Sequence, residues 1–227
     1  MVKLQYMHHS SFRISLDDCN ILIDPFVNTP KNLKIKTRTK CPASTRSLCD
    51  TDLILISHEH FDHFDKELIE EIVKRRDCKV IAHDSLLNEI NAPISKKQAI
   101  VPNKKLNIKG VCIEAFHVHH PNSFYPLGFK IEGNGISIVH MGDTYLMDSF
   151  NKIKTDVLIL PIGGQITLDI VDAVRLVKTI EPKIAIPMHY NTFDFIKASP
   201  REFKEKIEDS VVNSKAKILR YGETIRL

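Results

Sequence analysis

The chain has 227 residues, of which 43% are hydrophobic and 26% charged, as is ordinary for a soluble globular protein of one large or two small domains. The formal net charge of +4 is too small to indicate nucleic-acid binding by itself. The five cysteines are scattered without a Cys-x-x-Cys pair, which argues against a disulfide framework or a cysteine-ligated zinc knuckle. Met1–Ser11 lacks the apolar core of a signal peptide, and no later run approaches the ~18 apolar residues of a membrane span. We therefore expect a cytoplasmic protein with no membrane partner.

The N-terminal quarter predicts two short strands and a surface segment. Strands are expected at Tyr6–Ile14 and Asn20–Asp24, with a turn at Asp17–Asp18 between them, and Pro25 ends the second strand. Pro30–Arg46 is polar and basic and is expected to cross the surface. Its cations are Lys31, Lys34, Lys36, Arg38, Lys40 and Arg46. Two interpretations stay open: a solvated loop, or a collar that attracts an anionic substrate.

The rest of the chain alternates strands and helices. Short apolar or alternating runs predict strands at Asp52–Ser57, Lys79–Ala82, Val111–His117, Gly128–Glu132, Ile136–His140, Asp156–Pro161, Ile184–Pro187 and Ala216–Arg220. Helical spacing predicts helices at Lys66–Arg76, Ser85–Ile90, Asp169–Thr179 and Pro200–Ile207, with Asp65 and Thr167 as N-caps of the first and third. Gly133-Asn134-Gly135 indicates a hairpin. One mixed α and β domain over residues 1–227 is expected.

The most informative stretch is His58-Glu59-His60-Phe61-Asp62-His63, directly after an expected buried strand. Imidazole nitrogen and carboxylate oxygen are preferred ligands of divalent transition metals. Histidines two apart on an extended segment point the same way, so His58 and His60 can hold one ion. Asp62 and His63, beyond a turn, can reach a second. The density of histidine therefore predicts a metal site.

Other candidate ligands also follow expected strands, where loops on a rigid scaffold can share a site. Asp143 comes after Ile136–His140 and His189 after Ile184–Pro187. Three histidines, His117, His119 and His120, lie at or after the end of Val111–His117. His9 can lie near the site or make a structural hydrogen bond, and the second interpretation ranks first.

This order of motifs resembles the metallo-β-lactamase superfamily. The pattern is His-x-His-x-Asp-His after a buried strand, a further histidine, Gly-Asp-Thr, and a late histidine. Supporting stretches are Leu22–Phe26, Ala115–His117, Leu160–Gly164 and Ile186–Phe193. The branch it resembles most is that of metal-dependent hydrolases related to the ascorbate-phosphate lactonases. The resemblance implies a four-layer αββα sandwich, in which two mixed β-sheets are flanked by helices.

The resemblance also implies two metal sites. The first would use His58, His60 and His117, with His120 and then His119 as alternatives for the third ligand. The second would use Asp62, His63 and His189, and Asp143 would bridge both ions. Zinc ranks first, with manganese, iron and nickel as alternatives. Glu59 and Gln165 depart from the family pattern without removing a ligand.

The implied activity is hydrolysis of an ester-type bond by a hydroxide that bridges two divalent ions. The substrate would be a lactone or ester of a small metabolite, with or without a phosphate. Catalytic roles fall to Asp62, His189 and Asp143, and substrate contacts are expected from residues that flank the ligand loops: Tyr190, Asn191, Gln165 and Thr144. Two alternatives are kept: a phosphodiesterase or nuclease of the same fold, and a metal-binding protein without turnover. No nucleic-acid partner is expected, and homo-oligomers are left open.

Overall fold

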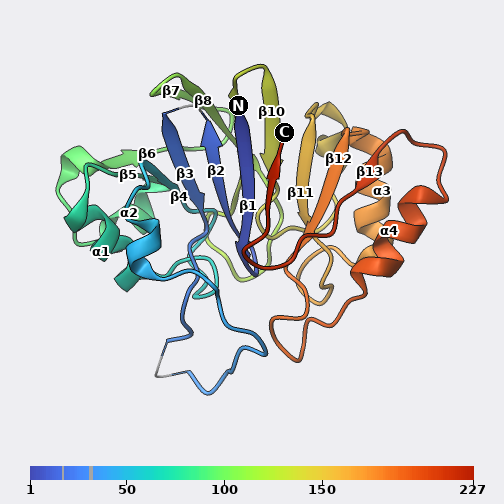
Figure 1. Ribbon diagram of the computed structural model, residues 1–227, viewed down its shortest axis with the longest axis horizontal. Coiled ribbons are helices and arrows are strands. Elements are labelled where there is room, and N and C mark those ends of the chain that lie inside the picture. The colour runs from blue at the N-terminus through green and yellow to red at the C-terminus, as the bar shows by residue number, and fades with distance from the viewer. Residues whose placement is uncertain (17, 31–32) are drawn as a thin grey trace.

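The chain folds into two mixed β-sheets, described by a computed structural model over residues 1–16, 18–30 and 33–227 (Figure 1). Within these residues each sheet has seven strands. The first sheet has the order β14 (Thr224–Arg226), β1 (Val2–His8), β2 (Ser11–Leu16), β3 (Cys19–Ile23), β4 (Leu53–Leu55), β5 (Lys79–Ala82), β6 (Lys97–Ala99). The second has the order β13 (Lys215–Ala216), β12 (Ile184–Met188), β11 (Val157–Pro161), β10 (Ile136–His140), β9 (Leu127–Gly133), β8 (Val111–His117), β7 (Lys105–Ile108).

Each sheet is antiparallel in one half and parallel in the other. In the first sheet β1, β2 and β3 pair antiparallel, whereas β3 to β6 pair parallel. In the second sheet β7 to β10 pair antiparallel, whereas β10 to β13 pair parallel. Parallel strands need crossover connections, and helices that supply them cover the outer faces.

In the part of the chain that the structure describes, four α-helices lie outside the two sheets. Helices α1 (Lys66–Arg75) and α2 (Asp84–Glu89) lie on the side of the first sheet, and α3 (Ile170–Ile180) and α4 (Pro200–Glu208) on the side of the second (Figure 1). Short 3₁₀ helices occupy Thr45–Leu48, Ile94–Lys96 and Asp148–Lys152. The longest described helix, α3, has 11 residues. No described helix is therefore long and apolar enough to cross a bilayer.

The alternating directions of strand side chains explain the layers. In β4, Leu53 and Leu55 belong to the core between the two sheets, whereas Ile54 belongs to the core beneath α1. A third apolar cluster joins the second sheet to α3 and α4. Because β4 is buried on both faces, its sequence is continuously apolar, and this is the signal that predicted it. The predicted four-layer sandwich is confirmed.

Helix starts follow the expected capping chemistry with one exception. The predicted N-cap Asp65 is confirmed, since its carboxylate accepts the Leu68 N–H at 3.1 Å. The predicted cap Thr167 is wrong. Asp169 caps α3 by accepting the Asp172 N–H at 2.9 Å, while the Thr167 hydroxyl donates to the Gly164 carbonyl.

Two expected strands differ from the structure. The predicted strand Tyr6–Ile14 is wrong, because the chain turns at His9-Ser10 between β1 and β2, with His9 at φ 57°. The turn expected at Asp17–Asp18 is present at Asp18, between β2 and β3, whereas Asp17 lies outside the described residues. The predicted closing strand Ala216–Arg220 pairs only at Lys215–Ala216, and β14 follows in the other sheet.

Candidate metal centre

Residues from five parts of the chain converge where the strands of both sheets end. His58 to His63 follow β4, His120 follows β8, Asp143 follows β10, and His189 follows β12. His9 joins them from the turn between β1 and β2. In the described structure these side chains form three groups whose ligand atoms lie within 4.8 Å of one another.

The first group consists of His58, His60 and His120. Their ring centroids are 4.6 to 4.8 Å apart, and His120 Nε2 lies 3.0 Å from His60 Nδ1. Two of these imidazoles come from the first sheet and one from the second. The three therefore meet across the sandwich.

The expected third ligand, His117, does not join this group and is corrected to His120. β8 stays paired with β9 as far as His117, opposite Leu127, so His117 still belongs to the sheet and its side chain is exposed. The chain leaves the sheet only afterwards, and His120 is the histidine that reaches the site. His119 is also exposed, and its ring lies beside Tyr145.

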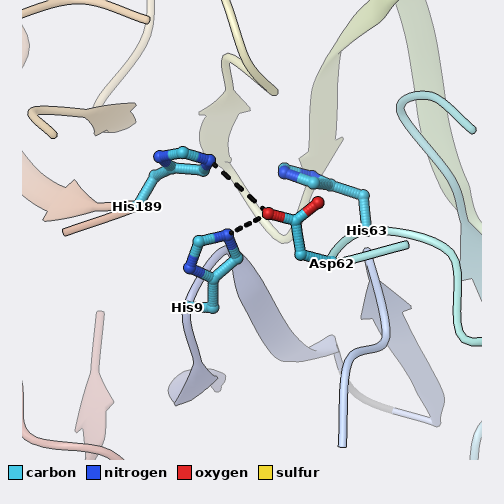
Figure 2. Close-up of side chains that lie close together, drawn as sticks. All are labelled: His9, Asp62, His63 and His189. Atoms are coloured by element: carbon cyan, nitrogen blue, oxygen red, sulfur yellow. Dashed lines mark hydrogen bonds and ion pairs between the residues drawn. The ribbon is translucent and has the colours of Figure 1, made fainter. Parts of the chain in front are cut away.

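The second group consists of His9, Asp62, His63 and His189, and Figure 2 shows their side chains around one common space. His9 Nε2–H donates to Asp62 Oδ2 at 3.1 Å, and His189 Nε2 lies 4.0 Å from the same oxygen. His9 is completely buried, and this contact fixes the direction of the Asp62 carboxylate.

Asp143 lies between the two groups. Its Oδ1 is 3.3 Å from His63 Nε2, and its Oδ2 is 2.9 Å from His189 Nε2 and 3.8 Å from His120 Nε2. It also forms the third group, with His58 and His63. One buried carboxylate thus faces both histidine sets, the placement expected of a bridging ligand.

Four of the histidines have one ring nitrogen committed to an outer partner. The acceptors of their N–H groups are Ser57 Oγ for His58 at 2.9 Å, the Asn122 carbonyl for His60 at 3.3 Å, the Ile166 carbonyl for His120 at 3.2 Å, and Asp24 Oδ2 for His63 at 2.8 Å. In His58, His60 and His120 these bonds leave the other ring nitrogen with a lone pair directed into the site, as in metal-ligating histidines. Burial opposes protonation of His63, but Asp143 and Asp24 raise its pKa well above the usual value, so its inner nitrogen binds a metal only by giving up a proton. The outer hydrogen bond of each histidine therefore sets both which ring nitrogen carries the proton and how the ring is oriented.

Comparison with known proteins agrees with this geometry. Residues 3–189 match the family described as "Beta-lactamase superfamily domain". The chain belongs to this superfamily. A "UPF0173 metal-dependent hydrolase" of Staphylothermus marinus is 36% identical over 99% of this chain and 98% of its own length. One from Methanosarcina mazei is 30% identical over 100% and 99%.

This member of the superfamily therefore also belongs to the UPF0173 metal-dependent hydrolases. Among solved structures it is similar to Igni18, a metallo hydrolase from Ignicoccus hospitalis, with a TM-score of 0.84 and 29% identity. That match covers 99% of this chain and 97% of the other. Superfamily, fold and the general class of metal-dependent hydrolase agree with the sequence resemblance.

The electrostatics of the hydrolase site favour cations. Burial opposes ionisation of Asp143, but His189 and His63 outweigh it and hold the pKa of this carboxyl well below its usual value. Burial also opposes ionisation of Asp62, whose pKa is nevertheless lowered by the hydrogen bond from His9. In the first group, burial lowers the pKa of His120 to about 4 and that of His58 well below its usual value. Carboxylates are thus ionised and these imidazoles neutral, as metal ligands must be.

The residues present fit divalent metal ions. His58 Nε2 is buried without a hydrogen-bond partner, and so are His63 Nε2 and Asp143 Oδ1, which lie 3.3 Å apart. Because the outer nitrogens of His60 and His120 carry their N–H groups, the lone pairs of His60 Nδ1 and His120 Nε2 face each other at 3.0 Å. Buried polar atoms without partners are costly unless something satisfies them. Cations between these atoms would remove the penalty.

Asp24 is a site residue that sequence reasoning missed. It is completely buried and accepts three hydrogen bonds: the Ser57 N–H at 2.7 Å, the Ser57 hydroxyl at 2.6 Å and His63 Nδ1–H at 2.8 Å. It therefore orients His63 directly and His58 through Ser57. The available signal was a carboxylate after the apolar run of β3. For His9 the available signal was the run of four consecutive polar residues from His8 to Ser11, which spans the end of β1 and the start of β2.

The residues expected to contact substrate are mostly engaged in the fold. Tyr190 packs in the apolar cluster beneath α3 and α4. The Asn191 side chain makes hydrogen bonds in both directions with the Ala198 backbone, and Thr144 accepts the His119 N–H. Gln165 is exposed, with φ at 63°. Substrate contact by these residues stays a prediction, for which Gln165 has the most accessible side chain.

Proposed function

We propose that this protein is a dinuclear metal-dependent hydrolase that cleaves an ester-type bond in a small-molecule substrate. The single observation that carries the proposal is the set of histidines whose outer nitrogens are committed and whose inner nitrogens converge around Asp143. A surface cluster of polar residues would have no need of such orientation.

The side chains divide the work of holding two ions. His58, His60 and His120 would hold one, Asp62, His63 and His189 would hold the other, and Asp143 would contact both. Bound divalent ions would acidify a shared water and polarise a carbonyl or phosphoryl oxygen. Zinc suits this imidazole-rich set, and manganese, iron or nickel would also fit.

The remaining residues hold this arrangement rigid. His9 orients the Asp62 carboxylate, and Asp24 keeps His63 in the tautomer that directs Nε2 inward. His189 Nε2 lies 2.9 Å from Asp143 Oδ2 and 4.0 Å from Asp62 Oδ2, and these three side chains are the ones we assign to catalysis. Because its pKa is held low, Asp62 is an ionised carboxylate, which can accept a hydrogen bond from a water molecule and orient it.

A lactone or ester that carries a phosphate or another anion is the substrate we favour. The basic segment that ends at Arg46 lies beside the site, because the Arg38 N–H donates to the Thr192 carbonyl at 2.8 Å, three residues after His189. Lys34, Lys36 and Lys40 in this segment are exposed. Its first cation, Lys31, lies outside the described residues. The exposed lysines support the collar interpretation, and they keep phosphodiester cleavage as the second candidate.

A reducing compartment such as the cytoplasm agrees with the cysteines. All five are within the described residues and all are free thiols. Disulfides persist in oxidising compartments, so unpaired thiols favour a cytoplasmic enzyme.

The test combines metal analysis with turnover. Protein loaded separately with zinc, manganese, iron or nickel is assayed on chromogenic lactones, carboxylic esters and bis-aryl phosphates, with Asp62→Ala as the inactive control. We expect about two ions per chain and turnover of a lactone or ester. Preferential turnover of bis-aryl phosphates, with salt-steep binding of RNA or DNA, would favour the second candidate. Two bound ions without turnover of any substrate would leave a metal-binding protein and overturn the proposal.

A further inference from the structure

Glu59, between the first two histidines, bonds to a distant part of the chain. Its Oε2 accepts the Ser123 hydroxyl at 2.9 Å and its Oε1 accepts the Phe124 N–H at 3.0 Å. Both donors belong to the segment Pro121–Pro126, which connects β8 to β9 directly after His120. A side chain from the first sheet thus fastens a connection of the second.

The same segment touches two of the three histidines in the first group. The Asn122 carbonyl accepts from His60 Nε2–H at 3.3 Å, and the Ser123 N–H donates to the His120 carbonyl at 3.4 Å. His58 and His120 are buried, but His60 is only half-buried, so packing restrains its ring least. The orientation of His60 therefore depends on where Pro121–Pro126 is held.

A second contact fixes the far side of the segment. The Tyr125 ring stacks on the His83 ring, with centroids 3.9 Å apart and planes at 13°. Between the two contacts, the Phe124 side chain is 82% exposed. Phe124 has its N–H bound by Glu59 and its ring free, so it is a sensitive reporter of whether the segment is held.

We propose that Glu59 is a positioning residue that clamps Pro121–Pro126 across the two sheets and so orients His60 toward the first metal site. The inference rests on the proposed function, because it assumes that His58, His60 and His120 hold an ion. With the clamp closed, the Asn122 carbonyl takes the outer N–H of His60 and the inner nitrogen faces His120. With the clamp released, the ring of His60 turns freely and the group loses its preorganised third ligand.

The chain offers matched variants. Glu59→Ala removes both hydrogen bonds. Glu59→Gln removes the charge but keeps a carbonyl oxygen for the Phe124 N–H and an amide that can donate to Ser123 Oγ. Glu70→Ala is the control, because Glu70 also accepts a backbone N–H, from Asn91 at 2.8 Å, on the exposed side of α1.

The first readout is metal affinity, measured by competition with a chromophoric zinc chelator. Removing a partner that orients a ligating histidine weakens binding by roughly 10- to 100-fold, so we expect Glu59→Ala to raise the Kd of one zinc ion by about tenfold. Glu59→Gln should stay within about threefold of wild type, as a partly preserved clamp would. Glu70→Ala should be unchanged. Equal weakening by Gln and Ala would assign the effect to the lost charge and overturn the clamp.

The second readout needs no metal and no activity. Chymotrypsin cleaves after exposed aromatic residues, and the Phe124–Tyr125 bond is such a site, whereas the next bond is protected by Pro126. In metal-free protein, Glu59→Ala should speed cleavage after Phe124 by about tenfold, since two hydrogen bonds that hold the segment are lost. Cleavage after Phe195, which is 50% exposed, is the internal control and should not change.

The outcomes separate this inference from the proposed function. Wild-type cleavage rates in Glu59→Ala would overturn the clamp, and faster cleavage with unchanged zinc affinity would overturn the positioning role. A wild-type protein that takes up no metal would instead contradict the proposed function, and the cleavage rates after Phe124 would still decide whether Glu59 holds the segment.

Discussion

Replacing Asp24 tests how far one buried carboxylate holds the site together. Asp24 is completely buried and accepts three hydrogen bonds, two from Ser57 and one from His63. Asp24→Ala would leave three buried donors without an acceptor, at about 1–3 kcal/mol each. The sum, about 3–9 kcal/mol, is comparable to the whole stability of a domain, which is about 5–15 kcal/mol. We therefore choose Asp24→Asn for measurement.

Asp24→Asn keeps one carbonyl oxygen and turns the other acceptor into a donor. The oxygen can still accept the Ser57 N–H, but the amide group then faces the Ser57 hydroxyl and His63 Nδ1–H. We expect the free energy of unfolding of metal-free protein to fall by about 2–3 kcal/mol. Urea unfolding monitored by circular dichroism measures this change. The slope of the free energy of unfolding against urea concentration should be the same as in wild type.

The double mutant with Ser57→Ala isolates the bonds that Ser57 contributes. Because the two residues share a hydrogen-bond network, the effects of Asp24→Asn and Ser57→Ala should be non-additive by about 1 kcal/mol. An Asp24→Asn protein within about 0.5 kcal/mol of wild type would refute the reasoning, since surface substitutions away from any network have effects of that size.

Three further predictions concern single residues. His120→Ala should lose one bound ion per chain, whereas His117→Ala should bind metal normally and keep its free energy of unfolding within about 0.5 kcal/mol of wild type, because His117 is exposed. Plasma emission spectrometry measures the metal content and urea unfolding the stability. Metal loss in His117→Ala alone would restore His117 as the third ligand. Asp143→Ala should lower metal content below that of wild type, and an unchanged two-ion stoichiometry would show that Asp143 is no bridge. Burial opposes ionisation of Asp52, but hydrogen bonds from Lys109, the Asn20 N–H and Arg76 lower its pKa below the ordinary 3.8. A carboxyl group whose pKa is lower in the folded than in the unfolded state stabilises the fold at pH values above the unfolded-state pKa. This stabilisation is lost as the pH falls through the folded-state pKa. At pH 7 the free energy of unfolding of wild type should therefore exceed that of Asp52→Asn by about 1–3 kcal/mol. A difference that persists unchanged at pH 2 would contradict this.

Patterns within a few residues of the chain were sufficient for much of the architecture. The apolar run of β4 indicated a strand buried on both faces, and Gly133-Asn134-Gly135 indicated the hairpin that joins β9 and β10. Asp65 could be recognised as a cap because its carboxylate and the Leu68 N–H that donates to it are only three residues apart. The motif from His58 to His63 was equally local, so its clustering at one end of a strand followed from spacing alone.

Contacts between distant residues decided the rest. Whether His117 or His120 completes the first group depends on where the ladder between β8 and β9 ends, and that depends on the pairing partner rather than on the residues of β8. His9 enters the second group because the chain turns directly after β1, where His9 adopts a positive φ although no glycine lies nearby. Asp24 became a site residue only when β3 paired with β4 and brought it to Ser57.

The sequence by itself therefore determined which residue types are available for metal binding and where most strands lie along the chain, because ligand spacing and strand periodicity are local properties. The sandwich that carries them was implied by the resemblance to a known superfamily. The tertiary structure alone decided which histidines converge, which nitrogen of each ring faces inward, and which acidic residues, Asp24 and Glu59, hold them there. Those choices depend on distances between atoms far apart in the chain, and only the packing of two sheets against each other sets such distances.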